Sequence, residues 1–271
     1  MGSRSVMWNT HCDLQDPRLW RYTESIVPRS RILGPVGVAW FGLTLAAIVY
    51  ATRMALVVAP EDALQGNVFR IIFYHVPHSM LSLVWPYVNL AASVGFLYWQ
   101  RRDPLKALAA DALAISAAEV TVVYGSICLL TGMLWGKVEW GIWWTWDWRL
   151  TSMLVLWLLY VAYLMLRKLS STGQTQTLAA VLSIFAGIDV PIVYMSIRWW
   201  RTQHPSPIFF SGDPDSKMDP SMMPAFLWNL AAWAAWGVLI LTMRYLLERR
   251  RQDNEQDAAL KAIEDSLELT R

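Results

Sequence analysis

Long apolar runs separated by short polar segments dominate the sequence, and six of these runs approach the length needed to cross a membrane. A helix needs about 20 residues to span the hydrocarbon core of a bilayer. The runs predict helices over residues 33–58, 77–99, 105–134, 150–167, 177–199 and 224–246. Pro77 marks a break just before the second helix. The pattern therefore predicts an all-α integral membrane protein with six transmembrane helices, which form one domain over residues 33–246.

Basic residues are concentrated in alternate loops, and this distribution predicts how the helices are oriented. Cytoplasmic loops of membrane proteins carry an excess of lysine and arginine. The richer set of segments holds Arg18, Arg21, Arg29, Arg31, Arg101, Arg102, Lys106, Arg167, Lys168, Arg249, Arg250 and Arg251. We therefore expect both termini in the cytoplasm, with a cytoplasmic leader at 1–32 and a charged cytoplasmic tail at 247–271. The leader lacks a short apolar run before a small-residue cleavage site, so we expect no cleaved signal peptide.

Composition narrows the chemistry that the chain can perform. Apolar residues make up 55% of the sequence and charged residues 16%, and the net charge is only +2. Basic residues spread thinly over loops do not indicate nucleic-acid binding. Cys12 lies in the leader and Cys128 inside the third predicted helix, so no disulfide between them is expected. The sequence has no GxxxxGK[ST] phosphate-binding loop, and we expect this chain not to power transport with ATP.

The segment between the third and fourth predicted helices, at about 135–149, is unusually rich in tryptophan. Its six tryptophans are Trp135, Trp140, Trp143, Trp144, Trp146 and Trp148. Tryptophan is common at membrane interfaces, but this density exceeds what such a position requires. Its side chain offers a large flat face and a single N–H donor. We therefore expect the loop, which faces outward in the predicted orientation, to bind a large planar apolar ligand.

Two histidines are predicted on the same side of the membrane as the tryptophan loop. His75 ends the first outer loop, and His204 begins the last one. Neutral imidazole is a natural donor for iron, zinc or copper, and a zinc site would usually have three or four protein ligands. Two histidines beside an aromatic surface are instead the ligand set expected for six-coordinate haem iron. His78 remains an alternative ligand, because it shares a face with His75 if the helix begins before Pro77.

The outer loops also carry cations that could meet the carboxylates of a ligand. Guanidinium groups bind carboxylates through paired hydrogen bonds. Arg149, Arg198 and Arg201 all lie in suitable loops, and the sequence does not choose among them. Asp147 ends the tryptophan core, where it could pair with Arg149 or orient an indole N–H.

Three acids fall inside the predicted helices, where carboxylates are costly and mark functional sites by default. Asp111 lies near the cytoplasmic end of its helix, where water can solvate it. Glu119 and Asp189 lie nearer mid-depth, and no lysine or arginine within the membrane is an obvious partner. A structural role for these two acids is favoured over a proton relay.

The residues around the tryptophan loop resemble those of a known family. The run WGKVEWGIWWTWDWRLTS is similar to the WGxWWxWD motif of haem-handling proteins, and the surrounding plan resembles CcmC, the haem-delivery membrane protein of bacterial cytochrome c maturation. The similarity extends to FYHVP around His75, to the TG before Trp135 and to DVPIVYMSIRWWRTQH at 189–204. It covers about residues 35–246. His78 departs from the family pattern, in which a small residue is expected.

The resemblance implies that haem b, iron-protoporphyrin IX, binds non-covalently at the periplasmic face of a bacterial inner membrane. The implied axial ligands are His75 and His204. The implied haem-binding surface consists of Trp135, Trp140, Gly141, Trp143, Trp144, Trp146, Asp147 and Arg149. The resemblance also implies that the chain is a delivery protein and not an enzyme, and that it presents haem to the periplasmic haem chaperone CcmE. Its other implied partners are CcmD and the ABC transporter subunits CcmA and CcmB.

Three alternative functions predict different features of the sequence. A haem lyase-like synthase shares the tryptophan motif, but it is usually larger and has histidines within the membrane, which are not predicted here. A haem-translocating channel needs a polar or aromatic path across the bilayer. Glu119 and Asp189 alone are weak evidence for such a path. A b-type cytochrome would bury its ligands within helices and not place them in loops.

Overall fold

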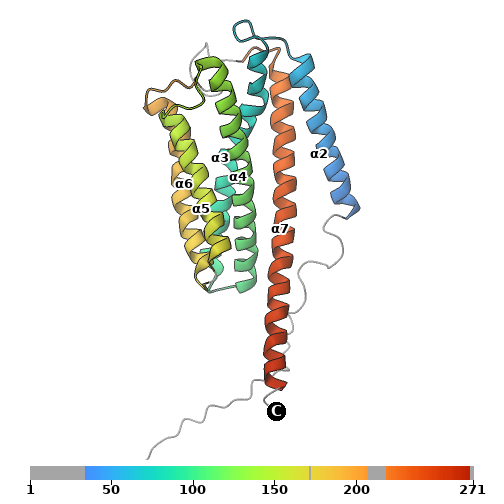
Figure 1. The fold of residues 1–271 in the computed structure, drawn as a ribbon. Coiled ribbons are helices and arrows are strands. Elements are labelled where there is room, and N and C mark those ends of the chain that lie inside the picture. Colours follow the sequence, from blue (N-terminus) through green and yellow to red (C-terminus); the bar gives the residue numbers. More distant parts are fainter. Residues whose placement is uncertain (1–33, 171, 207–217, 269–271) are drawn as a thin grey trace, which may run out of the picture. The chain divides into compact units, whose positions relative to one another are not determined.

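The computed structural model describes residues 34–170, 172–206 and 218–268, which form helices joined by short connections (Figure 1). In chain order the elements are α2 (Pro35–Arg53), the π-helical turn η1 (Met54–Val58), the 3-10 turn η2 (Asn67–Ile71), α3 (Ile72–Trp99), α4 (Pro104–Trp140), α5 (Trp148–Leu169), α6 (Thr175–Trp199) and α7 (Met223–Glu268). Residues Ile32–Arg249 form one compact unit, whereas the end of α7 from Arg250 belongs to a second unit. The predicted leader 1–32, with His11 and Cys12, lies outside the described residues.

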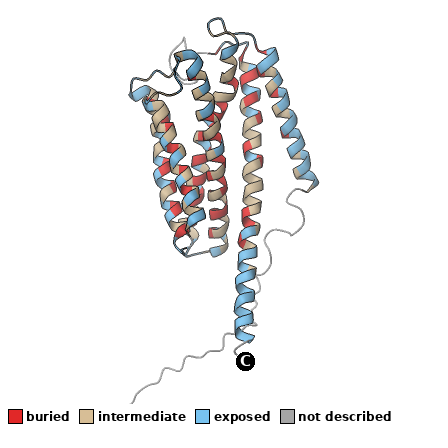
Figure 2. Cartoon of the chain, viewed as in Figure 1, coloured by how far each residue is buried: buried red, intermediate tan, exposed pale blue. Residues whose placement is uncertain are grey.

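Six of the described helices are long and apolar enough to cross a membrane, which confirms the predicted all-α membrane fold. The spans are Pro35–Val58, Asn67–Trp99, Pro104–Trp140, Trp148–Leu169, Thr175–Trp199 and Met223–Glu268. Figure 2 shows α2 exposed along most of its length, and Val36, Leu43 and Val49 are among its exposed apolar side chains. Lipid tails are as apolar as leucine, so a bilayer covers such a surface without penalty. The chain is a multi-pass membrane protein.

The start of α3 differs from the prediction, because the helix begins at Ile72 and contains Pro77. A proline inside a helix removes one backbone hydrogen bond and was expected to mark a break. The turn before it is nevertheless helical, and its Phe73 is fully buried in a cluster with Ala55 and Phe226. Burying a phenylalanine side chain contributes roughly 1.5–3 kcal/mol, which offsets the lost bond. His75 consequently lies on a helix and not in a loop.

The end of α4 also differs from the prediction, because the helix continues six residues past 134 to Trp140. It ends at Gly141, whose φ of 74° is a left-handed conformation that glycine adopts without strain. Lys137 donates a hydrogen bond to the Gly141 carbonyl over 2.8 Å and helps to close this end. Trp135 and Trp140 therefore lie on α4, and the loop that remains between α4 and α5 is short.

Helices α3, α4, α5 and α6 pack against one another around a buried asparagine. Asn89 on α3 donates to the carbonyl of Ala114 on α4 over 2.7 Å. Its side-chain oxygen accepts hydrogen bonds from Tyr160 of α5 and Ser183 of α6. Buried polar groups that are fully paired hold a unique arrangement of helices. One side chain thus connects all four helices of the bundle on which the site is built.

Two ion pairs correct the predictions made for the intramembrane acids. Asp111 is buried and not solvated, and both of its oxygens accept hydrogen bonds from Arg167 of α5, at 2.7 and 2.8 Å. Glu119 has a partner after all, since Arg244 of α7 donates two hydrogen bonds to its carboxylate. Asp189 differs from both, because its buried Oδ2 has no hydrogen-bond partner among the described residues.

Candidate functional site

The two predicted ligands, His75 and His204, lie next to each other although 129 positions separate them in the sequence. His75 is the fourth residue of α3, and His204 lies in the non-helical segment after α6. Their ring centroids are 6.4 Å apart, and the ring planes are tilted by 37°. A metal sits about 2 Å from an imidazole nitrogen, so the rings of two imidazoles that bind one metal have centres several ångströms apart. The observed separation of the two rings is compatible with a shared metal.

In each ring Nδ1 has a hydrogen-bond partner, which leaves Nε2 as the candidate donor to a metal. Nδ1 of His75 lies 3.0 Å from the hydroxyl of Thr131 on α4. Nδ1 of His204 lies 2.9 Å from the carbonyl of Pro205, and a carbonyl only accepts hydrogen bonds. His204 therefore carries its proton on Nδ1 and has a lone pair on Nε2.

His78 lies on the same helix but contacts a different set of residues. Its Nδ1 is 2.7 Å from the carbonyl of Tyr74, and its ring packs against Tyr124 and Trp233, with centroid distances of 5.1 and 4.6 Å. Trp233 belongs to α7, so His78 points toward that helix. The structure brings His75 and His204 together and does not bring His78 to them.

Both histidines line a small cavity whose other walls include Trp135, Trp140, Trp144 and Arg149. The cavity has a volume of about 50 Å³. Trp135 and Trp140 meet edge to face with centroids 5.0 Å apart, and the buried indole N–H of Trp144 has no hydrogen-bond partner among the described residues. Trp143 and Trp146 are exposed instead, the latter by 78%. The tryptophan segment thus contributes both cavity walls and an exposed aromatic surface beside them.

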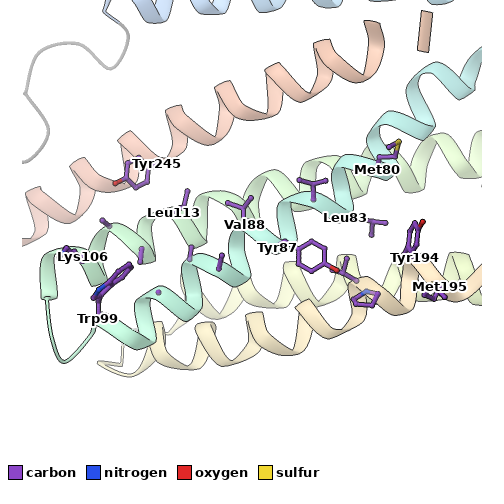
Figure 3. A pocket seen from close by; sticks show the side chains of 18 residues that line it. Met80, Leu83, Tyr87, Val88, Trp99, Lys106, Leu113, Tyr194, Met195 and Tyr245 are labelled. Carbon is purple, nitrogen blue, oxygen red and sulfur yellow. The ribbon is translucent and has the colours of Figure 1, made fainter. Parts of the chain in front are cut away.

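A larger cavity elsewhere in the bundle contains none of these residues. Its volume is about 1250 Å³, and it runs along α3 with α4, α6 and Tyr245 of α7 on its sides (Figure 3). The side chains around it are mostly apolar, among them Leu83, Val88 and Leu113. It offers no histidine or cysteine that could bind a metal, so size alone does not identify the site.

Asp147 connects the tryptophan segment to the segment that carries His204. One of its oxygens accepts the backbone N–H of Leu150 over 2.8 Å and caps the start of α5. The other accepts the hydroxyl of Thr202 over 2.6 Å, and the Thr202 oxygen in turn accepts the backbone N–H of His204 over 3.0 Å. The carboxylate therefore has both oxygens engaged in positioning backbone, in place of the predicted pairing with Arg149 or an indole.

The three candidate arginines occupy different environments. Arg149 lines the cavity, and its guanidinium donates to the carbonyl of Val193 and, over 3.4 Å, to the hydroxyl of Ser79. Arg198 stacks over the ring of Tyr194 at 4.8 Å, and Arg201 is exposed. Arg149 is thus the arginine of the three that shares the cavity with the histidines.

The electrostatic surroundings keep His204 neutral. Burial and the nearby positive charge of Arg149 lower the pKa of His204 to about 4. The ordinary pKa of histidine is about 6.5. At neutral pH its Nε2 lone pair is therefore free of a proton and available to a metal.

Comparison with known sequences identifies the family. The sequence model of the family described as "Heme exporter protein C" (CcmC) matches residues 26–259. The chain belongs to the CcmC family. It is 38% identical over 198 residues to heme exporter protein C of Bradyrhizobium diazoefficiens, which covers 71% of this chain and 72% of that protein. It is 32% identical over 258 residues to heme exporter protein C of Escherichia coli, which covers 90% and 95% of the two chains.

Several residues around the two histidines have no role predicted from the sequence. Thr131 and Gly132 contact His75, Thr202 holds the backbone of His204, and Ser79 contacts Arg149. In the sequence, Thr131 and Gly132 stand out only as part of a motif. Their roles depend on how α3 packs against α4, and no pattern within one helix encodes that register. Thr202 carries a weak local signal, since threonine hydroxyls accept backbone N–H groups two residues ahead.

Proposed function

We propose that this chain binds haem non-covalently between His75 and His204 and delivers it for cytochrome c maturation. The observation that carries the proposal is the 6.4 Å separation of the two imidazole rings beside a tryptophan-lined cavity. The relatives are named for heme export, which agrees with that ligand set. Membership of the family alone assigns no residue, whereas the ring geometry supports two particular ligands.

The residues around the histidines fit a porphyrin. Trp135, Trp140 and Trp144 offer flat apolar faces, and the N–H of Trp144, which has no partner among the described residues, can donate to a carboxylate of the ligand. Arg149 adds a positive charge to the same cavity, which suits an anionic propionate. Bound haem would supply an iron that accepts both imidazoles and a reactive edge for transfer. This chain's contribution is to hold the iron and to leave that edge accessible.

The small cavity supports delivery over permanent storage. Sites that enclose a small molecule usually have volumes of about 300–1,000 Å³. A cavity of about 50 Å³ is far smaller than this, so haem bound beside the two histidines would extend beyond it. The exposed Trp143 and Trp146 lie in the adjoining loop, where they could cover part of one face. Haem held in this way keeps an edge available to an acceptor protein.

The two ligands are anchored differently, which supports stepwise release. His75 belongs to α3 and contacts α4, whereas His204 lies in a non-helical segment fastened to Asp147 through Thr202. We expect His204 to leave the iron first and His75 to leave last. This modifies the prediction from sequence, in which both ligands came from loops.

The family and the charge pattern support a location and a set of partners. We place the site at the periplasmic face of a bacterial inner membrane, with both termini in the cytoplasm, because the basic residues favour the opposite end of the helices. The acceptor is the haem chaperone CcmE. The small protein CcmD and the transporter subunits CcmA and CcmB complete the proposed assembly.

The test is the visible absorption spectrum of the purified full-length protein, loaded with haem in detergent. The wild type is expected to show low-spin haem with two histidine ligands. His75→Ala and His204→Ala should each lose haem or convert it to high spin. His78→Gln serves as the control and should keep the wild-type spectrum. A wild type that binds no haem, or a spectrum indifferent to both alanine substitutions, would refute the proposal.

A further inference from the structure

We propose that Thr131 is a positioning residue, which fixes the ring and the tautomer of His75 while Gly132 provides the space in which that ring lies. The inference rests on the proposed function, since it explains how one of the two haem ligands is held ready. It assigns no contact between Thr131 and haem.

The hydrogen bonds of Thr131 determine which way its hydroxyl points. Thr131 lies on α4 and donates to the carbonyl of Ile127 over 2.6 Å, with the Cys128 carbonyl also within 3.2 Å. A hydroxyl has one hydrogen and two lone pairs. With its hydrogen directed to a helix carbonyl, the Thr131 oxygen can accept from Nδ1 of His75, which lies 3.0 Å away. His75 then carries its proton on Nδ1, and the lone pair resides on Nε2.

Gly132, the next residue of α4, provides the space in which the ring lies. A Cβ at this position would lie 3.0 Å from Cε1 of His75, closer than most real contacts allow, and 3.9 Å from Nε2. The imidazole therefore lies against the backbone of α4, in space that only glycine leaves free. Cε1 is bonded to both ring nitrogens, so a displacement here would also move Nε2.

The same arrangement is not available to His204. The partner of its Nδ1 is the carbonyl of the next residue, Pro205, which moves together with it. Thr131, in contrast, belongs to a different helix from His75 and ties the ring to the bundle. Partners of this kind orient a metal-binding histidine and increase its basicity, and their loss typically weakens metal affinity by about 10- to 100-fold.

The first experiment compares haem affinity in three variants of the full-length protein. Thr131→Val keeps the shape of the side chain but removes the acceptor, and we expect haem binding to weaken by about 10- to 100-fold. Thr131→Ser restores the hydroxyl and should recover most of the affinity. Thr121→Val is the matched control, because Thr121 is a buried residue of α4 whose hydroxyl also donates to a carbonyl four residues back, at 2.8 Å. It should bind haem like the wild type.

The second experiment needs no haem. Nitrogen-15 NMR of histidine-labelled apoprotein in detergent reports which ring nitrogen carries the proton, and His75→Ala identifies the signal. The wild type and Thr121→Val are expected to show His75 protonated on Nδ1 alone, whereas Thr131→Val should show a mixture. Gly132→Ala, which displaces the ring and keeps the hydroxyl, should weaken haem binding and provides a second test if Thr131→Val does not fold.

The outcomes separate the two proposals. Failure of the wild-type protein to bind haem would refute the proposed function, while the NMR result would still decide whether Thr131 sets the tautomer. If the wild type binds haem and Thr131→Val matches Thr121→Val in both affinity and tautomer, the positioning role is wrong. The role is also wrong if Gly132→Ala binds haem as tightly as the wild type.

Discussion

Removing the Thr202 hydroxyl should weaken haem binding without touching either ligand. Thr202 donates to Oδ2 of Asp147 over 2.6 Å and accepts the backbone N–H of His204 over 3.0 Å. Thr202→Val keeps the side-chain shape but breaks both bonds. The segment that carries His204 then loses its attachment to the start of α5, while His75 on α3 is unaffected.

The expected size of the effect follows from the kind of bond that is lost. A hydrogen bond to a charged group contributes about 1.5–3 kcal/mol. If that free energy holds His204 in the ligating position, its loss raises the Kd for haem by about 10- to 100-fold, since about 1.4 kcal/mol corresponds to a factor of ten. Asp147→Asn should behave similarly. Its amide oxygen can still cap α5, but its NH₂ group cannot accept the hydroxyl of Thr202.

The assay is a haem titration of detergent-solubilised apoprotein, followed by the low-spin absorption bands. Thr145→Val is the matched control, because the Thr145 hydroxyl lies in the loop between α4 and α5 that carries Asp147, is buried and has no hydrogen-bond partner among the described residues. It should titrate like the wild type. Equal affinities for Thr202→Val and Thr145→Val would refute the argument that Asp147 positions His204.

Two further predictions concern protonation and the packing of the bundle. Burial and Arg149 lower the pKa of His204 to about 4, so the proton should compete with iron at this ligand only as the pH approaches that value. Titrations are expected to show no His204-dependent loss of affinity from about pH 8 to 5, and a loss beginning near pH 6.5, the ordinary histidine value, would contradict the pKa. Arg167→Met leaves Asp111 buried without its main partner, and thermal unfolding should show a loss of about 3–5 kcal/mol. Asp111→Leu combined with Arg167→Met should recover most of that stability, and a double variant no more stable than Arg167→Met would show that the buried Asp111 carboxylate is not the cause.

The existence of the six helices was predictable because hydropathy alone encodes it. Their ends near the site were less so, and the reasons are physical. Pro77 indicated a helix start, but the burial of Phe73 against Ala55 and Phe226 extends α3 back to Ile72. Packing between distant segments decided that boundary, and a local breaker signal could not reveal it.

The site shows the same division between local and long-range information. Residue type and side of the membrane were enough to nominate His75 and His204, which the structure places 6.4 Å apart. Choosing between His75 and His78 required the direction of each side chain, since the two lie three residues apart on one helix. The partner of Glu119 was missed although Arg244 falls within the sixth predicted helix. Pairing between helices depends on their relative depth and rotation, which one sequence does not state.

The carboxylate of Asp147 has a mechanical consequence for an encounter with another protein. It accepts hydrogen bonds from the backbone N–H of Leu150 at the start of α5 and from the hydroxyl of Thr202. A displacement of the short loop between α4 and α5 would therefore break both hydrogen bonds together. The exposed Trp143 and Trp146 belong to that loop and present an aromatic surface that another protein can contact. A displacement of this loop would reach the segment of His204 through Thr202, whereas Nδ1 of His75 lies beside Thr131 within α4. Contact at the surface would thereby act on the segment that carries His204 while the four-helix bundle stays intact.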